Sequence, residues 1–228
     1  YINKIQHINT MGTILQEYDA KLMLKAGSLI GLDEVGRGAL AGPVFTAACL
    51  LKEDFFLNKE NLIITTAFRD SKKMSAKLRE HAFESLSHLR ANGSIDFEIT
   101  SASVQEIESF NISGATRLSL DRSLKAIFAR NASLAKSLIL LDGKPLKDFP
   151  YPHQAIVGGD DRSLAIACAS ILAKVARDRL MDSLGEQFPA YDWQKNKGYG
   201  TKFHREQVQS AGPCTEHRAL FLRKILTN

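Results

Sequence analysis

The sequence has few cysteines and no long apolar run. Its three cysteines, Cys49, Cys168 and Cys214, are far apart and form no Cys-x-x-Cys pair. An odd, scattered set of thiols argues against a disulfide framework and against a cysteine zinc site, so a reducing cytoplasm is the expected location. No stretch approaches the roughly 18 consecutive apolar residues of a membrane-spanning helix, so no membrane association is expected.

The chain also lacks internal repeats, low-complexity tracts, long linkers and a large excess of one charge. Its formal net charge of +5 tolerates a polyanionic partner without requiring one. The excess is uneven, because residues 195–205, KNKGYGTKFHR, contain no acid, but by itself this stretch is better explained as a solvated loop. We expect one domain over residues 1–228, with an N-terminal extension at about 1–27 and a helical C-terminal portion at about 201–228.

Apolar patterns predict alternating strands and helices. Ser75 as a cap, the helical spacing of Leu78, Phe83 and Leu89, and the closing Gly93 predict a helix with one buried face. Because the alternation is imperfect, the expected fold class is α/β, a mixed sheet flanked by helices with a small helical C-terminal portion. Strands are predicted at SLIGLDEV, VFTAACLL, IDFEITSAS, SLILLDG and HQAIVGGDD, and further helices at 115–131 and 162–188.

Acidic residues stand at the ends of several predicted strands: Asp33 with Glu34, Asp142, and Asp160. Ligands of layered α/β proteins gather at strand ends, so these side chains are expected to converge. Four carboxylates in one pocket repel one another unless protons or divalent cations neutralise them, and an all-oxygen set favours Mg²⁺ or Mn²⁺ over zinc. Two such ions about 4 Å apart can activate water and stabilise the leaving oxygen of a phosphodiester. Metal-dependent phosphodiester hydrolysis is the resulting hypothesis.

Simpler explanations exist for single acids, which often form turns or cap helices. We interpret Asp161 as the cap of the helix that follows it, and Asp178 as a solvated or ion-paired helix residue. The glycines after Glu34 also resemble a dinucleotide-binding turn. However, Pro43 is followed by a β-like run, and the two preceding acids would repel a pyrophosphate.

Taken in order, the sequence blocks resemble those of type 2 ribonucleases H, the ribonuclease HII family. The blocks lie between about Leu29 and Phe221 and read GLDEVGRGALAGPV, DSKKMS, NISGAT, LLDG, GGD, IACASILAKVARDRLM, NKGYGTKFH and GPCTEHR. The resemblance implies a ribonuclease H-like fold and an endonuclease for the RNA strand of RNA–DNA hybrids and for ribonucleotides embedded in duplex DNA. It further implies 3′-hydroxyl and 5′-phosphate products, a role in ribonucleotide removal during DNA repair and replication, and two Mg²⁺ or Mn²⁺ ions. We expect a monomer.

The resemblance also assigns roles to single residues. It implies that Asp33, Glu34, Asp142 and Asp160 bind the metal ions and catalyse cleavage. The substrate-binding residues would be Gly36, Arg37, Gly38, Tyr199, Lys197 and Lys202.

The resemblance implies that Gly36, Arg37 and Gly38 read the ribose 2′-hydroxyl and a phosphate, because glycines let the backbone approach the sugar closely. It also implies that Tyr199 packs against a sugar, and the two lysines are expected to contact phosphates. Ser71, Lys72 and Ser170 lie in family blocks without an assigned role. The chain departs from the common pattern at Gly158, Cys168 and Leu220, which leaves fine substrate preference open.

Two alternatives remain open. Ribonuclease HIII shares the core pattern, but it normally carries a Gly-Lys-Gly signature and an added N-terminal domain, whereas this chain has Gly-Arg-Gly and about 30 residues before the first strand. A catalytically silent nucleic-acid-binding module would be favoured by missing acids. Finally, adjacent side chains on a regular strand point to opposite faces, so we expect the strand to become irregular at or just after Glu34 and to end before Gly38.

Overall fold

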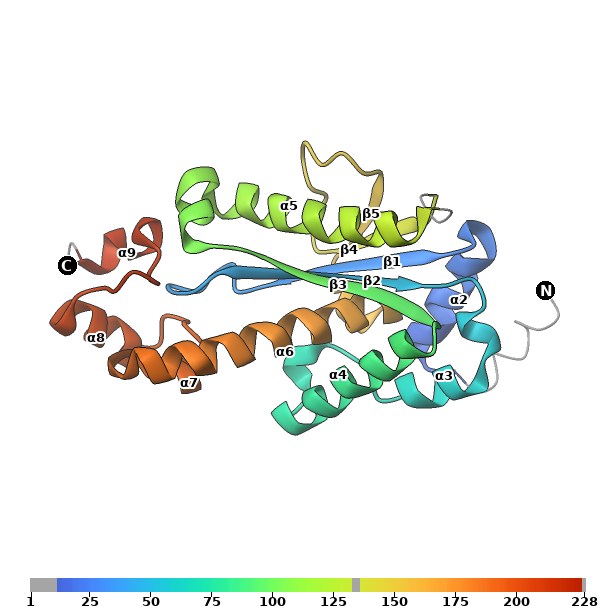
Figure 1. Cartoon of the computed structure of the whole chain (residues 1–228), viewed down its shortest axis with the longest axis horizontal. Helices are drawn as coiled ribbons and strands as arrows, with labels where there is room; N and C mark the ends of the chain where they lie inside the picture. The colour runs from blue at the N-terminus through green and yellow to red at the C-terminus, as the bar shows by residue number, and fades with distance from the viewer. Residues whose placement is uncertain (1–11, 133–135, 227–228) are drawn as a thin grey trace.

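A mixed five-stranded sheet forms the centre of the molecule in the computed structural model, which describes residues 12–132 and 136–226 (Figure 1). The strand order is β3-β2-β1-β4-β5. Strands β1, β2 and β3 pair antiparallel, whereas β4 and β5 continue the sheet parallel to β1. The bounds are β1 Leu29–Val35, β2 Val44–Leu51, β3 Ile95–Ala102, β4 Leu138–Asp142 and β5 His153–Ile156. The predicted mixed sheet is confirmed.

Helices cover both faces of this sheet. Helix α5 lies on one face and α6 on the other, with α3 and α4 beside α6 and with α7, α8 and α9 at the end where the chain finishes (Figure 1). The α-helices are α2 Ile14–Ala26, α3 Lys59–Thr65, α4 Ala76–Ala91, α5 Val104–Arg130, α6 Leu164–Gln187, α7 Trp193–Asn196, α8 Lys202–Ala211 and α9 Ala219–Leu226. Short 3₁₀ turns are η2 Phe55–Leu57, η3 Ser71–Lys73, η5 Gly159–Asp161 and η6 Pro189–Tyr191.

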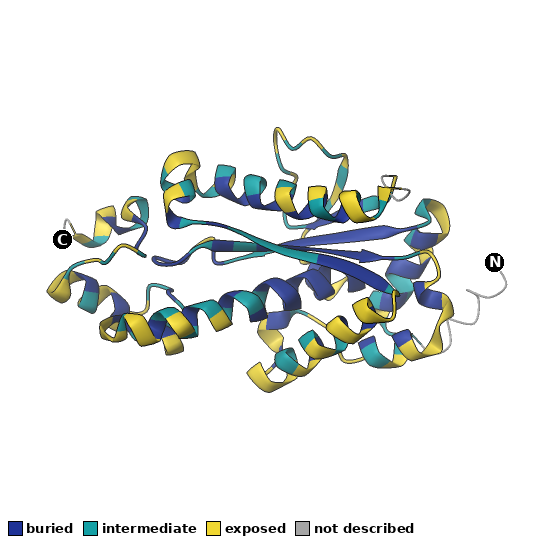
Figure 2. Ribbon diagram, in the orientation of Figure 1, coloured by how far each residue is buried: buried dark blue, intermediate teal, exposed yellow. Residues whose placement is uncertain are grey.

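The alternation of side chains along β1 creates a core on each face. Ile30 and Leu32 pack in a cluster with Leu124 of α5, whereas Leu29 packs with residues of α6 on the opposite face. Burying each such side chain is worth about 1.5–3 kcal/mol. Figure 2 shows the resulting dark, buried central sheet and the buried stretch of α6.

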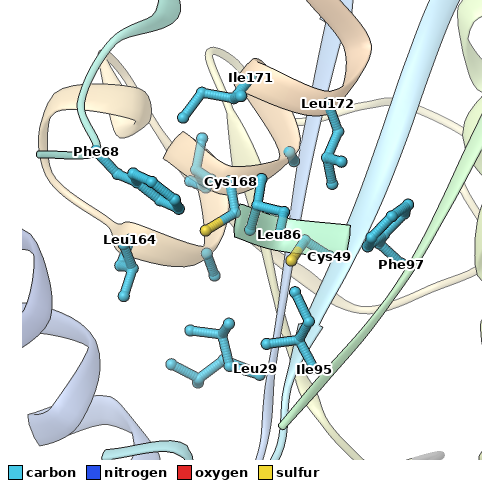
Figure 3. Packing of buried hydrophobic residues seen from close by; sticks show 14 of the residues in the cluster. Leu29, Cys49, Phe68, Leu86, Ile95, Phe97, Leu164, Cys168, Ile171 and Leu172 are labelled. Atoms are coloured by element: carbon cyan, nitrogen blue, oxygen red, sulfur yellow. The ribbon is translucent and has the colours of Figure 1, made fainter. Parts of the chain in front are cut away.

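Close approach of α6 to the sheet depends on a glycine. A Cβ at Gly31 would lie 2.1 Å from the main chain of Ala165, so β1 and α6 are in direct backbone contact there. Next to this contact, Cys49 and Cys168 are buried among leucine, isoleucine and phenylalanine side chains (Figure 3). All three cysteines of the chain fall within the described residues and are free thiols, as expected.

Several local expectations are confirmed and some are wrong. Ser75 caps α4, but Leu78 is 48% exposed and the buried face is formed by Ala82, Leu86 and Leu89. The periodicity identifies the apolar stripe, but it does not indicate how much of the stripe a neighbouring layer covers. No helix in the described part of the chain combines the length and the apolarity that crossing a membrane requires.

The start of α6 also corrects the sequence interpretation. Ser163, not Asp161, caps this helix, because Asp161 lies inside the η5 turn and forms an ion pair with Lys73. Asp178 is ion-paired as predicted, with its carboxylate 2.7 Å from the Lys174 Nζ. Strand β5 ends at Ile156, which places the acid that follows it on the turn, beyond the strand itself.

At the two chain ends the expectations are tested only in part. Residues 12–27 of the expected extension include α2, which packs Ala20 and Met23 into the core. The expected helical C-terminal portion is confirmed as α8 and α9. Residues 1–11 and 227–228 lie outside the described residues, and the division of the chain into domains stays a prediction.

Candidate active site

Three of the predicted acids come together at one edge of the sheet. Asp33 lies near the end of β1, Asp142 ends β4, and Asp160 lies in the η5 turn that follows β5. Because β1, β4 and β5 run parallel, their carboxyl ends meet. One carboxylate oxygen from each acid lies within 4.8 Å of the other two. The expected convergence of these three acids is confirmed, while their role stays a prediction.

Glu34 lies beside this cluster and not within it. Its carboxylate accepts a hydrogen bond from Arg37 Nη1 at 3.1 Å, and it lines a hollow that also contains Asp142. Asp33 and Glu34 follow one another in β1, so their side chains leave the strand on opposite sides. Glu34 also borders a second hollow, together with Asp33. Glu34 therefore lines both hollows.

The strand ends where the sequence predicted it would. Pairing with β2 continues through Val35, and Gly36 then has a φ of +88°. A Cβ at Gly36 would lie 2.2 Å from Nε of Arg177, so both the backbone conformation and the packing require glycine here. At Gly38, in contrast, an added Cβ would meet nothing within 4 Å. Gly36 therefore faces the protein interior, and Gly38 leaves open space on the outside.

Burial and mutual repulsion disturb the ionisation of these acids. Burial, and then the charges of Glu34 and Asp142, raise the pKa of Asp33 well above its usual range. Burial and the neighbouring Asp142 raise the pKa of Asp160 to about 6. Such raised pKa values indicate that these buried carboxylates have too few positive charges or hydrogen-bond donors around them to stabilise their ionised forms.

A hard divalent cation fits this set of donors. All three converging groups offer carboxylate oxygens, which Mg²⁺ and Mn²⁺ prefer, and the set contains no thiolate or imidazole that would favour zinc. A bound cation would favour the charged carboxylates against their burial and would offset their mutual repulsion, the two causes that raise the pKa values. Within the described residues, Lys72 forms an ion pair with one of the three acids: its Nζ lies 3.8 Å from Asp160, but its side chain is largely exposed.

Several residues around the acids had no predicted role. The Ser170 hydroxyl of α6 donates a hydrogen bond to Asp33 and is 2.9 Å from the Ser71 hydroxyl. Asp142 accepts a hydrogen bond from the Gly159 amide at 2.7 Å, which fixes the turn that carries Asp160. The only sequence signal for Ser71 and Ser170 was their position in blocks typical of the family. Because the two serines are far apart in the sequence, the sequence does not show that their hydroxyls meet beside Asp33.

Two hollows are lined in part by the acids. One, of about 310 Å³, contains Asp33, Ser71, Ser170, Lys174 and Tyr199. The other is about 470 Å³ and runs past Glu34 and Asp142. Basic side chains line the second hollow, namely Arg37, Arg117, Lys144 and Lys147.

The predicted substrate-binding residues are placed differently from one another. Tyr199 borders the smaller hollow, and the Arg177 guanidinium lies 5.4 Å from the centre of its ring. The ammonium group of Lys197 is engaged in an ion pair with Asp182. Lys202, at the start of α8, has an 85% exposed side chain. The structure therefore brings Tyr199 to the acids and leaves the two lysines outside both hollows.

The turn after Glu34 is held by the C-terminal part of the chain. Main-chain amides of Leu40 and Gly42 donate to the carbonyls of Gly198 and Glu216, both at 2.8 Å. The Arg218 amide in turn donates to the Leu40 carbonyl at 2.8 Å. Residues more than 150 positions apart therefore shape the loop next to the acids.

The family model and the curated relatives agree on one family. The family model described as Ribonuclease HII matches residues 30–224. The curated Ribonuclease HII of Caldicellulosiruptor saccharolyticus is 39% identical over 206 residues, covering 90% of this chain and 92% of that protein. The Ribonuclease HII of Ehrlichia canis is also 39% identical, covering 92% of each chain.

Solved structures share the fold at lower identity. The chain resembles RNase HII in the PCNA:RNase HII complex from Archaeoglobus fulgidus, with a TM-score of 0.61, 21% identity, and coverage of 84% of this chain and 93% of that one. It also resembles Bst-RNase HIII in complex with Mn²⁺, with a TM-score of 0.64, 17% identity, and coverage of 89% and 70%. At these identities the likeness concerns the fold alone.

Proposed function

The chain belongs to the ribonuclease HII family, and from this membership we propose that it cuts the RNA strand of RNA–DNA hybrids and cuts at single ribonucleotides embedded in duplex DNA. Membership makes it a metal-dependent ribonuclease H. The observation that supports the proposal most strongly is the meeting of Asp33, Asp142 and Asp160 within 4.8 Å. We propose the further consequence that it acts in ribonucleotide removal during DNA repair and replication, as a monomer in the cytoplasm.

The acids supply the catalytic centre of this proposal. Asp33, Asp142 and Asp160 would hold the divalent ions, and Glu34 at the edge of the cluster would complete the set. Two bound Mg²⁺ or Mn²⁺ ions would supply an activated water and a stabilised leaving oxygen, which yields 3′-hydroxyl and 5′-phosphate ends. The Ser170 hydroxyl fixes Asp33, and the Gly159 amide fixes Asp142, so two of the ligands are oriented before any ion binds.

The loop after Glu34 would check the sugar. Gly38 leaves its outer side open, so a ribose can approach the main chain closely there. A 2′-hydroxyl both donates and accepts hydrogen bonds, and it is the group that separates RNA from DNA. Gly36 and Arg37 would complete this turn, and Tyr199 would pack against the sugar from the smaller hollow.

The larger hollow suits the backbone of the bound duplex. Arg117, Lys144 and Lys147 line the same hollow as Glu34 and Asp142, so positive charge lies in the same hollow as the acids. Phosphates flanking the scissile position would be attracted to these side chains, and the binding would weaken as salt concentration rises. Lys202 is exposed and only 3.8 Å from the exposed Glu206, a contact that a phosphate could replace, whereas Lys197 would first have to leave Asp182.

Ribonuclease HIII remains the nearest alternative. Its fold matches at 17% identity in the Bst-RNase HIII structure, but the family model and the curated relatives favour ribonuclease HII, as does the Gly-Arg-Gly sequence. Substrate preference separates the two.

The test is a cleavage assay on two duplexes that differ in one 2′-hydroxyl. The protein is incubated with a DNA duplex containing a single ribonucleotide and with the all-DNA duplex, with and without Mg²⁺ or Mn²⁺. Cutting of the duplex at the ribonucleotide, with 3′-hydroxyl and 5′-phosphate ends and only when metal is present, supports the proposal. Cutting of the all-DNA duplex, or unchanged cutting by an Asp142→Asn variant, would overturn it.

A further inference from the structure

Two arginines are buried behind the loop formed by residues 36–43. Arg177 of α6 and Arg218, just before α9, both have 0% of their surface exposed. Among the ion pairs of the described residues, none includes either guanidinium. Burying a cation without an anionic partner is costly, so these two side chains require an explanation beyond packing.

Arg218 binds the loop through its carbonyl oxygens. Its Nε donates to the Gly42 carbonyl at 2.8 Å, and its Nη1 donates to the carbonyls of Gly36 at 2.7 Å and Arg37 at 3.2 Å. Its Nη2 is buried and has no hydrogen-bond partner. Burial and the neighbouring Arg177 lower the pKa of Arg218 to about 9, which still leaves it protonated at neutral pH.

Arg177 binds the other end of the same loop. Its Nε donates to the Pro43 carbonyl at 3.1 Å, and its Nη2 donates to the Ala41 carbonyl at 3.1 Å. Its Nη1 donates to the Lys197 carbonyl at 2.9 Å, which links the loop to the segment that carries Tyr199. The planar guanidinium fork matches such a set of fixed acceptors, and a lysine could not reproduce it.

Holding these carbonyls inward turns the following amides outward. In a planar trans peptide, the C=O of one residue and the N–H of the next point in opposite directions. The Gly36 and Arg37 carbonyls face Arg218, so the N–H groups of Arg37 and Gly38 face the other way. Arg37 and Gly38 are exposed, and neither amide donates a hydrogen bond to any described residue.

We propose that Arg177 and Arg218 are positioning residues that set the Gly36–Gly38 turn with two free main-chain donors directed at the substrate ribose. This inference rests on the proposed function, because it explains how the turn is ready to recognise a 2′-hydroxyl before the nucleic acid arrives. Preorganised donors lose little conformational freedom on binding. The two positive charges behind the turn add attraction for an electron-rich oxygen or phosphate in front of it.

The experiment measures discrimination separately from stability. Binding of a DNA duplex with one ribonucleotide and of the all-DNA duplex is measured by fluorescence anisotropy in EDTA, where no cleavage occurs, for the wild type, Arg218→Lys and Arg177→Lys. The preference is the ratio of the Kd for the all-DNA duplex to the Kd for the ribonucleotide duplex. We expect this ratio to fall about tenfold in each variant, because the main-chain donors are no longer held in place. Arg130→Lys is the matched control, because Arg130 is paired with Asp96 at the far end of α5 and should keep the full preference.

The outcomes separate this inference from the function on which it rests. A wild type that shows no preference and does not cut the ribonucleotide duplex with metal contradicts the proposed function. A wild-type preference that Arg218→Lys and Arg177→Lys both retain overturns the positioning role, whatever happens to their melting temperatures.

A second measurement uses the unaltered chain in case the variants do not fold. In ¹⁵N-labelled wild-type protein, we expect the amide resonances of Arg37 and Gly38 to shift with the ribonucleotide duplex and to shift less with the all-DNA duplex. Equal shifts with the two duplexes would contradict the inference.

Discussion

Substitution of Gly38 separates substrate recognition from folding. A Cβ at Gly38 would meet nothing within 4 Å and its φ is not in the left-handed region, so Gly38→Ala should change the free energy of unfolding by less than about 1 kcal/mol. A hydrogen bond from a main-chain nitrogen to a sugar oxygen needs an N···O distance of about 2.9 Å. The methyl group of an alanine at position 38 would keep the sugar farther away than this. Losing that hydrogen bond between neutral groups costs about 0.5–1.5 kcal/mol, so kcat/KM on a single-ribonucleotide duplex should fall about 2- to 12-fold.

Gly36→Ala is the matched comparison. Its φ of +88° costs about 1–2 kcal/mol for a residue with a Cβ, and that Cβ would lie 2.2 Å from Nε of Arg177. This variant should therefore lose both stability and activity. Thermal unfolding and steady-state cleavage are measured for both variants. Wild-type kinetics for Gly38→Ala would refute the proposed approach of the ribose, and a large loss of its stability would refute the structural premise.

Substitutions at other positions test the packing of α6 on the sheet, the ionisation of Asp19 and the role of the larger hollow. Gly31→Ala puts a Cβ 2.1 Å from the main chain of Ala165, so α6 must move by more than 1 Å, which should cost about 1–3 kcal/mol of stability and up to about 100-fold in kcat. Burial raises the pKa of Asp19 to about 7, so the folded state keeps a proton that the unfolded chain releases near pH 4, and stability falls as pH rises between these values. Between denaturant titrations at pH 5 and pH 8, about two pH units of this fall are sampled, so Asp19→Asn should remove roughly 3 kcal/mol of it. Lys144→Gln with Lys147→Gln should raise KM and flatten the salt dependence of binding by about 0.9 log units per lost phosphate contact.

Each of these results has a contrary outcome. Wild-type stability for Gly31→Ala would show that α6 adjusts without strain. A pH profile of Asp19→Asn parallel to that of the wild type would mean that this carboxyl is charged in the folded protein. An unchanged salt slope for the double lysine variant, equal to that of Lys77→Gln on the exposed surface of α4, would remove the larger hollow from the binding path.

The sequence predicted the acids because their signal is local. Asp33 and Asp142 each follow an apolar run at a strand end, and parallel strands bring such ends together without further information. The sheet order was not predictable in this way, because pairing between β1 and β4 depends on residues about 109 positions apart. Asp161 was misinterpreted for a related reason: its partner, Lys73, comes from a different part of the chain.

The arginines show the limit of pattern analysis most clearly. Arg177 stands among charged residues in VARDRLM, a stretch that by composition resembles a solvated helix face. In the fold its partners are main-chain carbonyls, which carry no residue-type signature. Recognising that such a side chain is buried requires knowing where the loop after β1 passes, and only the tertiary structure provides that.

The most direct test of the account is the location of the metal ions. Crystals of the protein grown with Mn²⁺ and a ribonucleotide-containing duplex, using an Asp142→Asn variant beside the wild type to slow cleavage, allow anomalous scattering to locate manganese. We predict two peaks about 4 Å apart, bounded by the carboxylates of Asp33 and Asp160, with at least one peak weakened in the variant. Manganese bound elsewhere, with none between these carboxylates, would contradict the account.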